Sequence, residues 1–234
     1  MSIEYKLING FRVFGFQTQD ELIAYVKKSP SILIAANGEK IYSKNTEIKN
    51  ISLKNIGYAD GIGAVYAIRK KGLKKAVRIP GSELWLRLIS QLHTDNTFYL
   101  IGSTTEVVTE VVKRLQVQFP KINIVGYRNG YLRSEEEVEN LELDIQYLKP
   151  DVVFVAQGSP RQEVLMQRIQ NSHKAIYMGL GGSFDVYTGF TKRAPKIFRN
   201  YGLEWLYRLL SQPSRIKRYK VLLPFAINVI RGKY

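Results

Sequence analysis

The sequence predicts an α/β fold in which helices flank a parallel sheet. Between residues 98 and 182, short apolar runs alternate with segments whose apolar residues recur at helical spacing. This alternation is typical of strand–helix–strand units, which build buried parallel sheets. Each apolar run also leads to a glycine, at the sheet edge where helix N-termini and backbone N–H groups meet ligands. One glycine can simply permit a tight turn, but several at one edge predict a ligand crevice.

The elements of this central region follow from the pattern in order. Strands are expected at 98–101, 122–125, 151–155 and 175–178, leading to Gly102, Gly126, Gly158 and Gly179. Helices are expected at 104–119 and 135–148. Another helix opens at Pro160, because proline suits a first helical turn.

Residues 1–97 extend the alternation with shorter elements. We expect a strand and a turn before a helix at 20–28, then a strand at 31–36 and helical periodicity at 39–42. Helices are also expected at about 64–71 and 83–92. The segment 51–56 fits a strand or part of a helix, and the sequence does not decide between them.

Composition excludes several kinds of chemistry. The chain has 234 residues, no cysteine and a formal charge of +15. Disulfides, thiolate metal sites and cysteine nucleophiles are therefore excluded, and a reducing compartment fits. The first 19 residues lack the apolar core of a signal peptide, and no apolar run approaches the roughly 20 residues needed to span a bilayer. We therefore expect a cytoplasmic protein.

The positive charge is concentrated near the C-terminus, where Glu204 is the single acid between residues 191 and 234. We expect a core at 1–195 and a basic helical appendage at 196–234, with an amphipathic helix at 202–210 that Pro213 interrupts. Such a tail implies an anionic partner: nucleic acid, anionic lipid or a phosphorylated substrate. Basic residues beside the apolar run 221–227 favour a helix lying in a membrane interface over a core helix with a solvated basic face.

Asp60 lies in a glycine-flanked loop ahead of the helix expected at 64–71. The structural interpretation, which the sequence alone favours, is a helix N-cap that accepts hydrogen bonds from the first free amides. The functional interpretation is a carboxylate that Gly61 and Gly63 leave open to a substrate, and the two interpretations are compatible.

Arg78 precedes a Pro-Gly turn and a helix start, so it is either a surface arginine or a residue facing a phosphate.

Two glycine-rich segments follow the last two strands of the central region, at 158–163 and 181–185. Ser159 and Gln162 have capping-box spacing, which indicates a well-formed helix start. Alternatively, free N–H groups and Gln162 face an anion or a sugar. Neither segment matches a dinucleotide fingerprint or a phosphate loop, and there is no serine-nucleophile elbow. The two histidines, His93 and His173, are isolated, so no pair has metal spacing.

Together these motifs resemble the WecG/TagA/CpsF family of bacterial glycosyltransferases, over about residues 37–218. The strongest pieces are Tyr-Ala-Asp-Gly-Ile at 58–62, Gly-Ser-Pro-Arg-Gln-Glu at 158–163, Gly-Gly-Ser-Phe-Asp at 181–185 and the block KRAPKIFRNYGLEWLYRLLSQPSRIKR from Lys192. That block is most similar to the WecG branch, the UDP-N-acetyl-D-mannosaminuronic acid transferases of enterobacterial common antigen synthesis. The resemblance implies a Rossmann-like sheet.

The resemblance also implies roles for matching residues. Asp60 matches the family's proposed catalytic base. The substrate-binding candidates are Asn37, Arg78, Gln162, Glu163, Gly181, Gly182 and Asp185. Arg208, Arg215 and Arg218 match arginines of a C-terminal appendage that closes over the active site and meets the membrane. One departure is Ala35, which stands where the teichoic-acid branch has a threonine and argues against that branch's N-acetylmannosamine donor.

The implied reaction is transfer, with inversion, from a UDP-sugar to undecaprenyl-diphosphate-linked N-acetylglucosamine. It takes place at the inner face of the cell membrane, with no cofactor and no metal, and self-association is expected from the resemblance. Such transfer needs one base for the acceptor hydroxyl and positive charge for the departing diphosphate, which arginine supplies through its fork of donors. Within this class, the alternative donor is UDP-N-acetylmannosamine or another UDP-hexose or uronate for teichoic acid, capsule or exopolysaccharide.

Two further classes compete with this interpretation. A nucleic-acid-binding protein explains the charge, but it leaves the glycine-rich sheet edge unused. A dinucleotide-dependent oxidoreductase explains the sheet, but the dinucleotide fingerprint is absent. We therefore expect no nucleic-acid partner.

Overall fold

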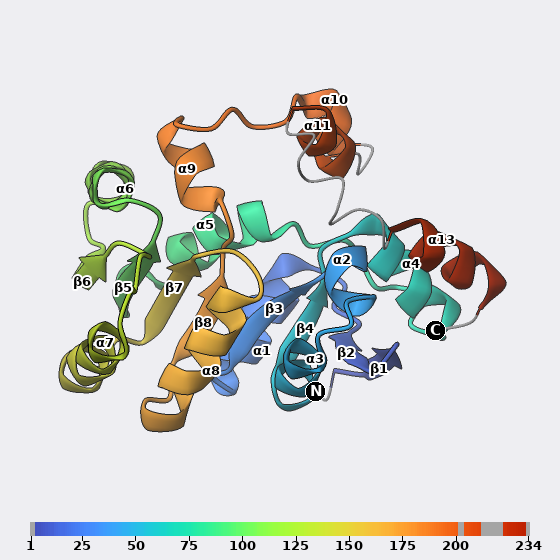
Figure 1. The fold of residues 1–234 in the computed structure, drawn as a ribbon, viewed down its shortest axis with the longest axis horizontal. Helices are drawn as coiled ribbons and strands as arrows, with labels where there is room; N and C mark the ends of the chain where they lie inside the picture. The colour runs from blue at the N-terminus through green and yellow to red at the C-terminus, as the bar shows by residue number, and fades with distance from the viewer. Residues whose placement is uncertain (1–2, 201–203, 212–221, 233–234) are drawn as a thin grey trace. The chain divides into compact units, whose positions relative to one another are not determined.

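The computed structural model describes residues 3–200, 204–211 and 222–232, and it confirms the α/β fold. Eight strands of the described chain form one sheet in the order β1-β2-β4-β3-β8-β7-β5-β6 (Figure 1). β1 and β2 are antiparallel, whereas β2–β4, β3–β8, β8–β7, β7–β5 and β5–β6 pair in parallel. The sheet is mostly parallel because helices connect most successive strands.

The elements expected in the central region are present. The strands are β1 Tyr5–Ile8, β2 Phe11–Phe14, β3 Ile32–Ala36, β4 Ile56–Ala59, β5 Thr97–Gly102, β6 Asn123–Arg128, β7 Val152–Ala156 and β8 Ile176–Gly179. The helices are α1 Gln19–Lys28, α2 Gly38–Ile41, α3 Thr46–Lys54, α4 Ile62–Lys70, α5 Gly81–Leu92, α6 Thr105–Gln118, α7 Glu135–Leu148, α8 Arg161–Ser172, α9 Ser183–Thr188, α10 Lys196–Asn200, α11 Glu204–Ser211 and α13 Leu222–Arg231. The undecided segment 51–56 is the end of α3 and the start of β4, separated by Asn55, whose side chain donates to the Ile51 carbonyl.

Two compact units make up the chain. The first unit comprises Met1–Thr18, Ala35–Pro80 and Lys192–Tyr234, and the second comprises Gln19–Ile34 and Gly81–Thr191. The boundary passes through β3, whose last two residues belong to the first unit. The expected separation of a core at 1–195 from an appendage at 196–234 stays a prediction.

The second unit is organised around β5, which lies between β6 and β7. Leu100 of β5 pairs with Tyr127 on one side and with Phe154 on the other. Trp85 of α5 is 1% exposed, and its ring contacts those of Phe154 and Phe184 at centroid separations of 5.9 and 5.8 Å. Edge-to-face pairs of this kind stabilise a core beyond simple burial. This packing fixes the strand ends at which the loops of the candidate site begin.

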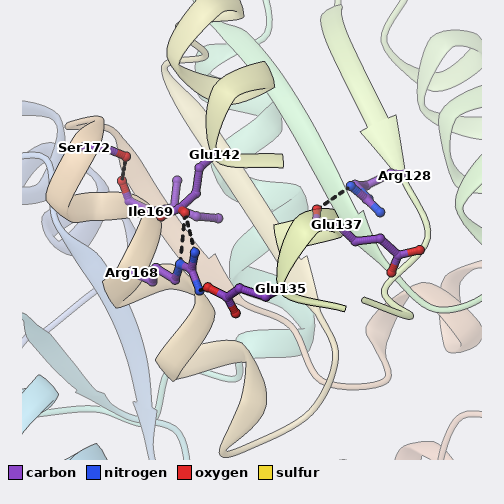
Figure 2. A network of polar contacts seen from close by, with 7 residues as sticks. All are labelled: Arg128, Glu135, Glu137, Glu142, Arg168, Ile169 and Ser172. Carbon is purple, nitrogen blue, oxygen red and sulfur yellow. Dashed lines mark hydrogen bonds and ion pairs between the residues drawn. The ribbon is translucent and has the colours of Figure 1, made fainter. Parts of the chain in front are cut away.

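Helices α7 and α8 are joined by a charged network, which Figure 2 shows. The Arg168 guanidinium on α8 donates to Glu142 at 2.9 and 2.8 Å and also to Glu135, both on α7. These hydrogen bonds, the one with Glu142 foremost, raise the pKa of Arg168 above its ordinary value. Arg128 of β6 donates to the backbone carbonyl of Glu137 at 3.2 Å. The network holds α8 in place, and the first turn of α8 belongs to the candidate site.

In the first unit, α13 packs beside α4 (Figure 1). Phe225 and Val229 of α13 are only 4% and 3% exposed. The Phe225 ring lies against Gly63 of α4, where an added Cβ atom would be 2.5 Å away, and it contacts the Tyr42 ring at a centroid separation of 5.3 Å. Lys70 of α4 donates to the Val229 carbonyl at 3.4 Å. The apolar run that the sequence assigns to a membrane interface therefore has one protein-facing side.

The rest of the C-terminal segment is described in part. Helix α11 confirms the helix expected at 202–210, and its Tyr207 ring contacts the Phe198 ring of α10 at 5.6 Å. Only the backbone of Arg208 is described, and Pro213, Arg215 and Arg218 lie outside the described residues. Among the described helices, none combines the length and the apolar character that crossing a bilayer requires.

Candidate active site

In the first unit, the loops after β3 and β4 meet at the strand ends. The Ala36 carbonyl accepts hydrogen bonds from the N–H groups of Asp60 and Gly61 at 3.0 and 3.3 Å. A Cβ atom on Gly61 would lie 3.3 Å from the Asn37 Cβ, so glycine permits this close approach. The structure thus brings together Asn37 and Asp60, two of the residues that the resemblance assigns to one site.

Asn37 is oriented by the helix that it opens. Its Oδ1 accepts the backbone N–H of Lys40 at 3.0 Å, which makes it the N-cap of α2. The Asn37 side chain is therefore fixed at the start of α2.

Asp60 does not occupy the N-cap position that the sequence favoured. Helix α4 begins at Ile62, its N-cap is Gly61, and no side chain caps it. The backbone N–H of Asp60 continues the strand by bonding to Ala36, so the cap falls one residue later. The capping explanation of Asp60 is wrong, and its half-buried carboxylate is a candidate for chemistry.

Arg78 is anchored to the same loop. Its Nε donates to the Asp60 carbonyl at 2.9 Å, and the N–H of Ile79 donates to the Ala59 carbonyl at 2.8 Å. The segment before α5 therefore runs beside the end of β4. A guanidinium, whose fork of donors suits phosphate, is thereby held beside the loop that carries Asp60.

In the second unit, Gln162 joins the loops that follow β7 and β8. Its Oε1 accepts from the N–H groups of Gly158 and Gly181 at 3.1 and 2.9 Å, and its Nε2 donates to Glu163 Oε1 at 2.9 Å. Gln162 and Glu163 are 3% and 1% exposed, and the Gln162 amide packs against Gly179. The amide of Gln162 therefore holds two glycine-rich loops together. Its expected role toward an anion or a sugar stays a prediction.

The start of α8 also differs from the sequence prediction. The helix begins at Arg161, and Pro160 occupies the N-cap without a side-chain hydrogen bond. The predicted capping box of Ser159 and Gln162 is therefore wrong. The Gln162 side chain accepts hydrogen bonds from the N–H groups of the two loops, so it does not turn back to the helix start.

The glycines of these loops leave their backbone accessible. A Cβ atom added to Gly158, Gly181 or Gly182 would meet no described atom within 4 Å. Gly158 and Gly181 also have φ angles of 79° and 57°, which side chains disfavour. A ligand can therefore approach this backbone more closely than side chains would permit.

Asp185, in the first turn of α9, accepts a hydrogen bond from Ser103 Oγ at 2.9 Å. Ser103 follows β5 with a φ of 52°, which is uncommon outside glycine. Its carbonyl accepts the Gly130 N–H at 2.9 Å, and the Gly130 carbonyl accepts the Gln157 side chain at 2.7 Å. Loops after β5, β6, β7 and β8 therefore meet here. Ser103 and Gln157 were missed, although both follow strand ends at the edge that the glycines marked.

The first turn of α6 contains an acidic residue, Glu106. Thr104 Oγ1 accepts the Val107 N–H at 3.3 Å, and hydrogen bonding to Thr104 holds the pKa of Glu106 below its ordinary value. Glu106 is therefore ionised at neutral pH in the first turn of the helix. A carboxylate there complements the helix dipole and competes with any phosphate.

The remaining predicted residues are not all placed. The arginine cluster of Arg208, Arg215 and Arg218 stays a prediction, since these side chains are not described. Within the described part of the chain, no three His, Asp or Glu residues gather as a metal site would require.

Comparison with known families decides among the classes that the sequence left open. A model described as the glycosyl transferase WecG/TagA/CpsF family matches residues 10–234, nearly the whole chain. The chain belongs to this family. Its members are glycosyltransferases that act in cell-surface polysaccharide synthesis, so the protein is a transferase with a sugar donor and an acceptor. The match includes every candidate residue of both units.

Proposed function

We propose that this glycosyltransferase moves N-acetylmannosaminuronic acid, with inversion, from UDP to undecaprenyl-diphosphate-linked N-acetylglucosamine in enterobacterial common antigen synthesis. Family membership supports glycosyl transfer. The donor is inferred from the WecG-like block that begins at Lys192 and from Ala35. Ala35 directly precedes Ala36, whose carbonyl holds the Asp60 loop. At position 35 this chain has the methyl group of alanine, where the teichoic-acid branch has the hydroxyl of threonine.

The observation that carries the mechanism is the Asp60 carboxylate beside the strand-end loops of the first unit. It takes the proton of the acceptor hydroxyl while that oxygen attacks the anomeric carbon of the donor. The new carbon–oxygen bond forms as the bond from the anomeric carbon to the phosphate oxygen breaks. The electron pair leaves with UDP, and attack from the opposite side inverts the anomeric centre.

The departing diphosphate requires positive charge at the same time. We assign Arg78 to this task, because its Nε bond to the Asp60 carbonyl fixes a permanent cation beside the base loop. Arg208, Arg215 and Arg218 are proposed to add charge, on the strength of the resemblance. In the second unit, the Asp185 carboxylate suits sugar or ribose hydroxyls, because an ionised carboxylate only accepts hydrogen bonds. The exposed backbone around Gly181 and Gly182 is proposed to bind substrate in the second unit.

A panel of UDP-sugars tests the proposal. The full-length protein is given undecaprenyl-diphosphate-linked N-acetylglucosamine and UDP-N-acetylmannosaminuronic acid, UDP-N-acetylmannosamine or UDP-N-acetylglucosamine. We expect transfer from the uronate, with an inverted anomeric centre in the product by NMR. Efficient use of UDP-N-acetylmannosamine with no activity on the uronate would overturn the donor, in favour of teichoic acid, capsule or exopolysaccharide synthesis. A retained configuration would overturn the role of Asp60 as base.

A further inference from the structure

We propose that the first unit carries its own binding surface for anionic lipid headgroups, formed by α4, α13 and the turn at 71–75. We call it the α4–α13 surface. It rests on the proposed function only in that a lipid-linked acceptor brings the enzyme to a membrane. The proposal adds part of the core to the C-terminal segment that the sequence assigned to membrane contact.

The two helices of this surface run side by side in the same direction (Figure 1). Near their starts, Gly63 of α4 lies against Phe225 of α13. Near their ends, Lys70 donates to the Val229 carbonyl at 3.4 Å. The C-terminal ends of α4 and α13 therefore lie together, so cations at both ends gather in one place.

The apolar part of the surface extends from the start of α4 to the middle of both helices. Ile62 and Tyr66 are 57% and 49% exposed, and their four-residue spacing places them on one face of α4. On α13, Phe225 and Val229 are buried, and Ile227, on the opposite side, is 39% exposed. Both helices thus present apolar side chains outward while their other faces are held by the protein.

The basic part lies at the helix ends. Its six cations are Arg69, Lys70, Lys71, Lys74, Lys75 and Arg231, all exposed except the half-buried Lys71. No acid occurs between residues 61 and 80 or from 205 to 234. The Lys70 ammonium also lies 5.1 Å from the centre of the Tyr66 ring, so cation and aromatic ring form one continuous surface.

The turn that presents Lys74 and Lys75 is held in place. Arg69 Nε donates to the Ala76 carbonyl at 2.7 Å, and the Leu73 N–H donates to the Ile68 carbonyl at 3.2 Å. The turn is therefore fastened to α4, and its two exposed lysines belong to a fixed surface.

Exposed apolar side chains next to cations favour lipid over nucleic acid. Cations alone suffice for phosphates of DNA or RNA, which gain nothing from Ile62. A membrane interface accepts both, with apolar side chains among the acyl chains and cations at the headgroups. Ile62 also lies two residues after Asp60, and α4 extends about 14 Å from there. The surface therefore begins at the loop of the proposed base, where a membrane-anchored acceptor would be needed.

Vesicle sedimentation of the full-length protein tests the basic part. The probes are phosphatidylglycerol–phosphatidylcholine vesicles, with phosphatidylcholine alone for comparison. Lys74→Gln combined with Lys75→Gln should lower the partition coefficient roughly 25-fold, about fivefold for each charge. The matched control is Lys27→Gln with Lys28→Gln, which removes two exposed charges from α1. The partition coefficient of this control should stay close to that of the wild type. Equal losses in both pairs would show that net charge alone causes the effect and would overturn the proposal.

A second pair tests the apolar part. Ile62→Ser with Tyr66→Ser should weaken vesicle binding even at high salt. Leu143→Ser with Tyr147→Ser on α7 is the control, because these residues have the same spacing and are 62% and 85% exposed. Equal behaviour of the two pairs would contradict the proposal.

Two further measurements separate the outcomes. Tighter binding of the wild type to duplex DNA than to vesicles, with the same loss on removing Lys74 and Lys75, would make this a nucleic-acid surface. Transfer to a water-soluble acceptor analogue should be unchanged in the Lys74→Gln, Lys75→Gln protein. Absence of transfer in the wild type would overturn the proposed function, whereas the vesicle result stands independently of it.

Discussion

The Asp60 carboxylate is the group on which the proposed chemistry depends. Asp60→Asn removes the base and should lower kcat by about 100- to 10,000-fold. The fold should survive, because the hydrogen bonds that join Asp60 to Ala36 and Arg78 are made by its backbone. Turnover of labelled UDP-sugar measures the first effect, and thermal unfolding the second. Asp95→Asn, in the exposed turn after α5, controls for the amide change. Near-normal turnover would remove Asp60 from the mechanism, and Asp185 would be tested next.

Ser103 is expected to position Asp185 through its hydroxyl. Ser103→Ala should raise the KM for the donor severalfold with a smaller change in kcat, because the carboxylate loses the donor that orients it. Ser103→Gly is the matched variant. It also removes the hydroxyl but relieves the left-handed backbone, so it should be about 1 kcal/mol more stable than Ser103→Ala. The same KM in both variants, despite this difference in stability, would assign the effect to the hydroxyl. A normal KM in Ser103→Gly would mean that only the backbone matters.

At the scale of single residues, the sequence predicted the positions of candidate residues better than the contacts that they make. Asn37, Asp60 and Gln162 were all identified, since each follows an apolar run at a glycine-rich strand end. The partner of Gln162 at Gly181 is 19 residues away, and Ser103 is 82 residues from Asp185. Periodicity carries no information on contacts between loops. The hydrogen bonds of Gln162 to the loops and of Ser103 to Asp185 therefore could not be predicted from the sequence.

At the scale of elements, α13 shows how one amphipathic helix serves two surfaces. Phe225→Ala should lower the free energy of unfolding by about 3 kcal/mol, because the ring is buried against Gly63 and Tyr42. Ile227→Ala, on the exposed face of the same helix, should cost less than about 0.5 kcal/mol. Urea unfolding of both variants measures the difference. Similar losses would mean that α13 is not docked on α4 in solution.

Helices and strands were predictable where local pattern decides them, and their ends were not. The apolar residues of α6 and α7 recur over four turns, so both helices were found. The start of α4 depends on how far β4 continues through the Asp60 N–H to Ala36, which is a contact between separate strands. The inward face of α13 likewise depends on Gly63, far away in the sequence.

At the scale of the whole molecule, strand order was the part that local pattern could not supply. Successive strands β5 and β6 are neighbours, but β7 pairs with the other side of β5, and β8 leads back to β3. All of these strands combine a short apolar run with a glycine in or shortly after the strand, so their sequences do not indicate which strands pair. The sheet edge at which the candidate residues lie was predictable nonetheless, because parallel strands end at the same edge in any order.

Three tyrosines couple the stability of the second unit to alkaline pH. Burial raises the pKa of Tyr99, Tyr177 and Tyr187, and the hydrogen bond from Tyr99 to Asp144 adds to the shift at Tyr99. In the unfolded chain these phenols lose their protons near pH 10, whereas the folded protein retains them. The unfolded state then binds fewer protons, so stability is fully present below about pH 10 and falls as the pH rises further.

Tyr99→Phe isolates this effect from the many lysines, which lose charge in the same pH range and relieve repulsion in a chain of formal charge +15. The variant loses the hydrogen bond to Asp144, so it should be less stable than wild type at neutral pH. Because one titrating phenol is gone, its urea midpoint should fall less steeply between about pH 10 and pH 11. The lysines are the same in both proteins, so their contribution cancels in the comparison of slopes. Parallel slopes for wild type and Tyr99→Phe would show that the buried phenol does not retain its proton.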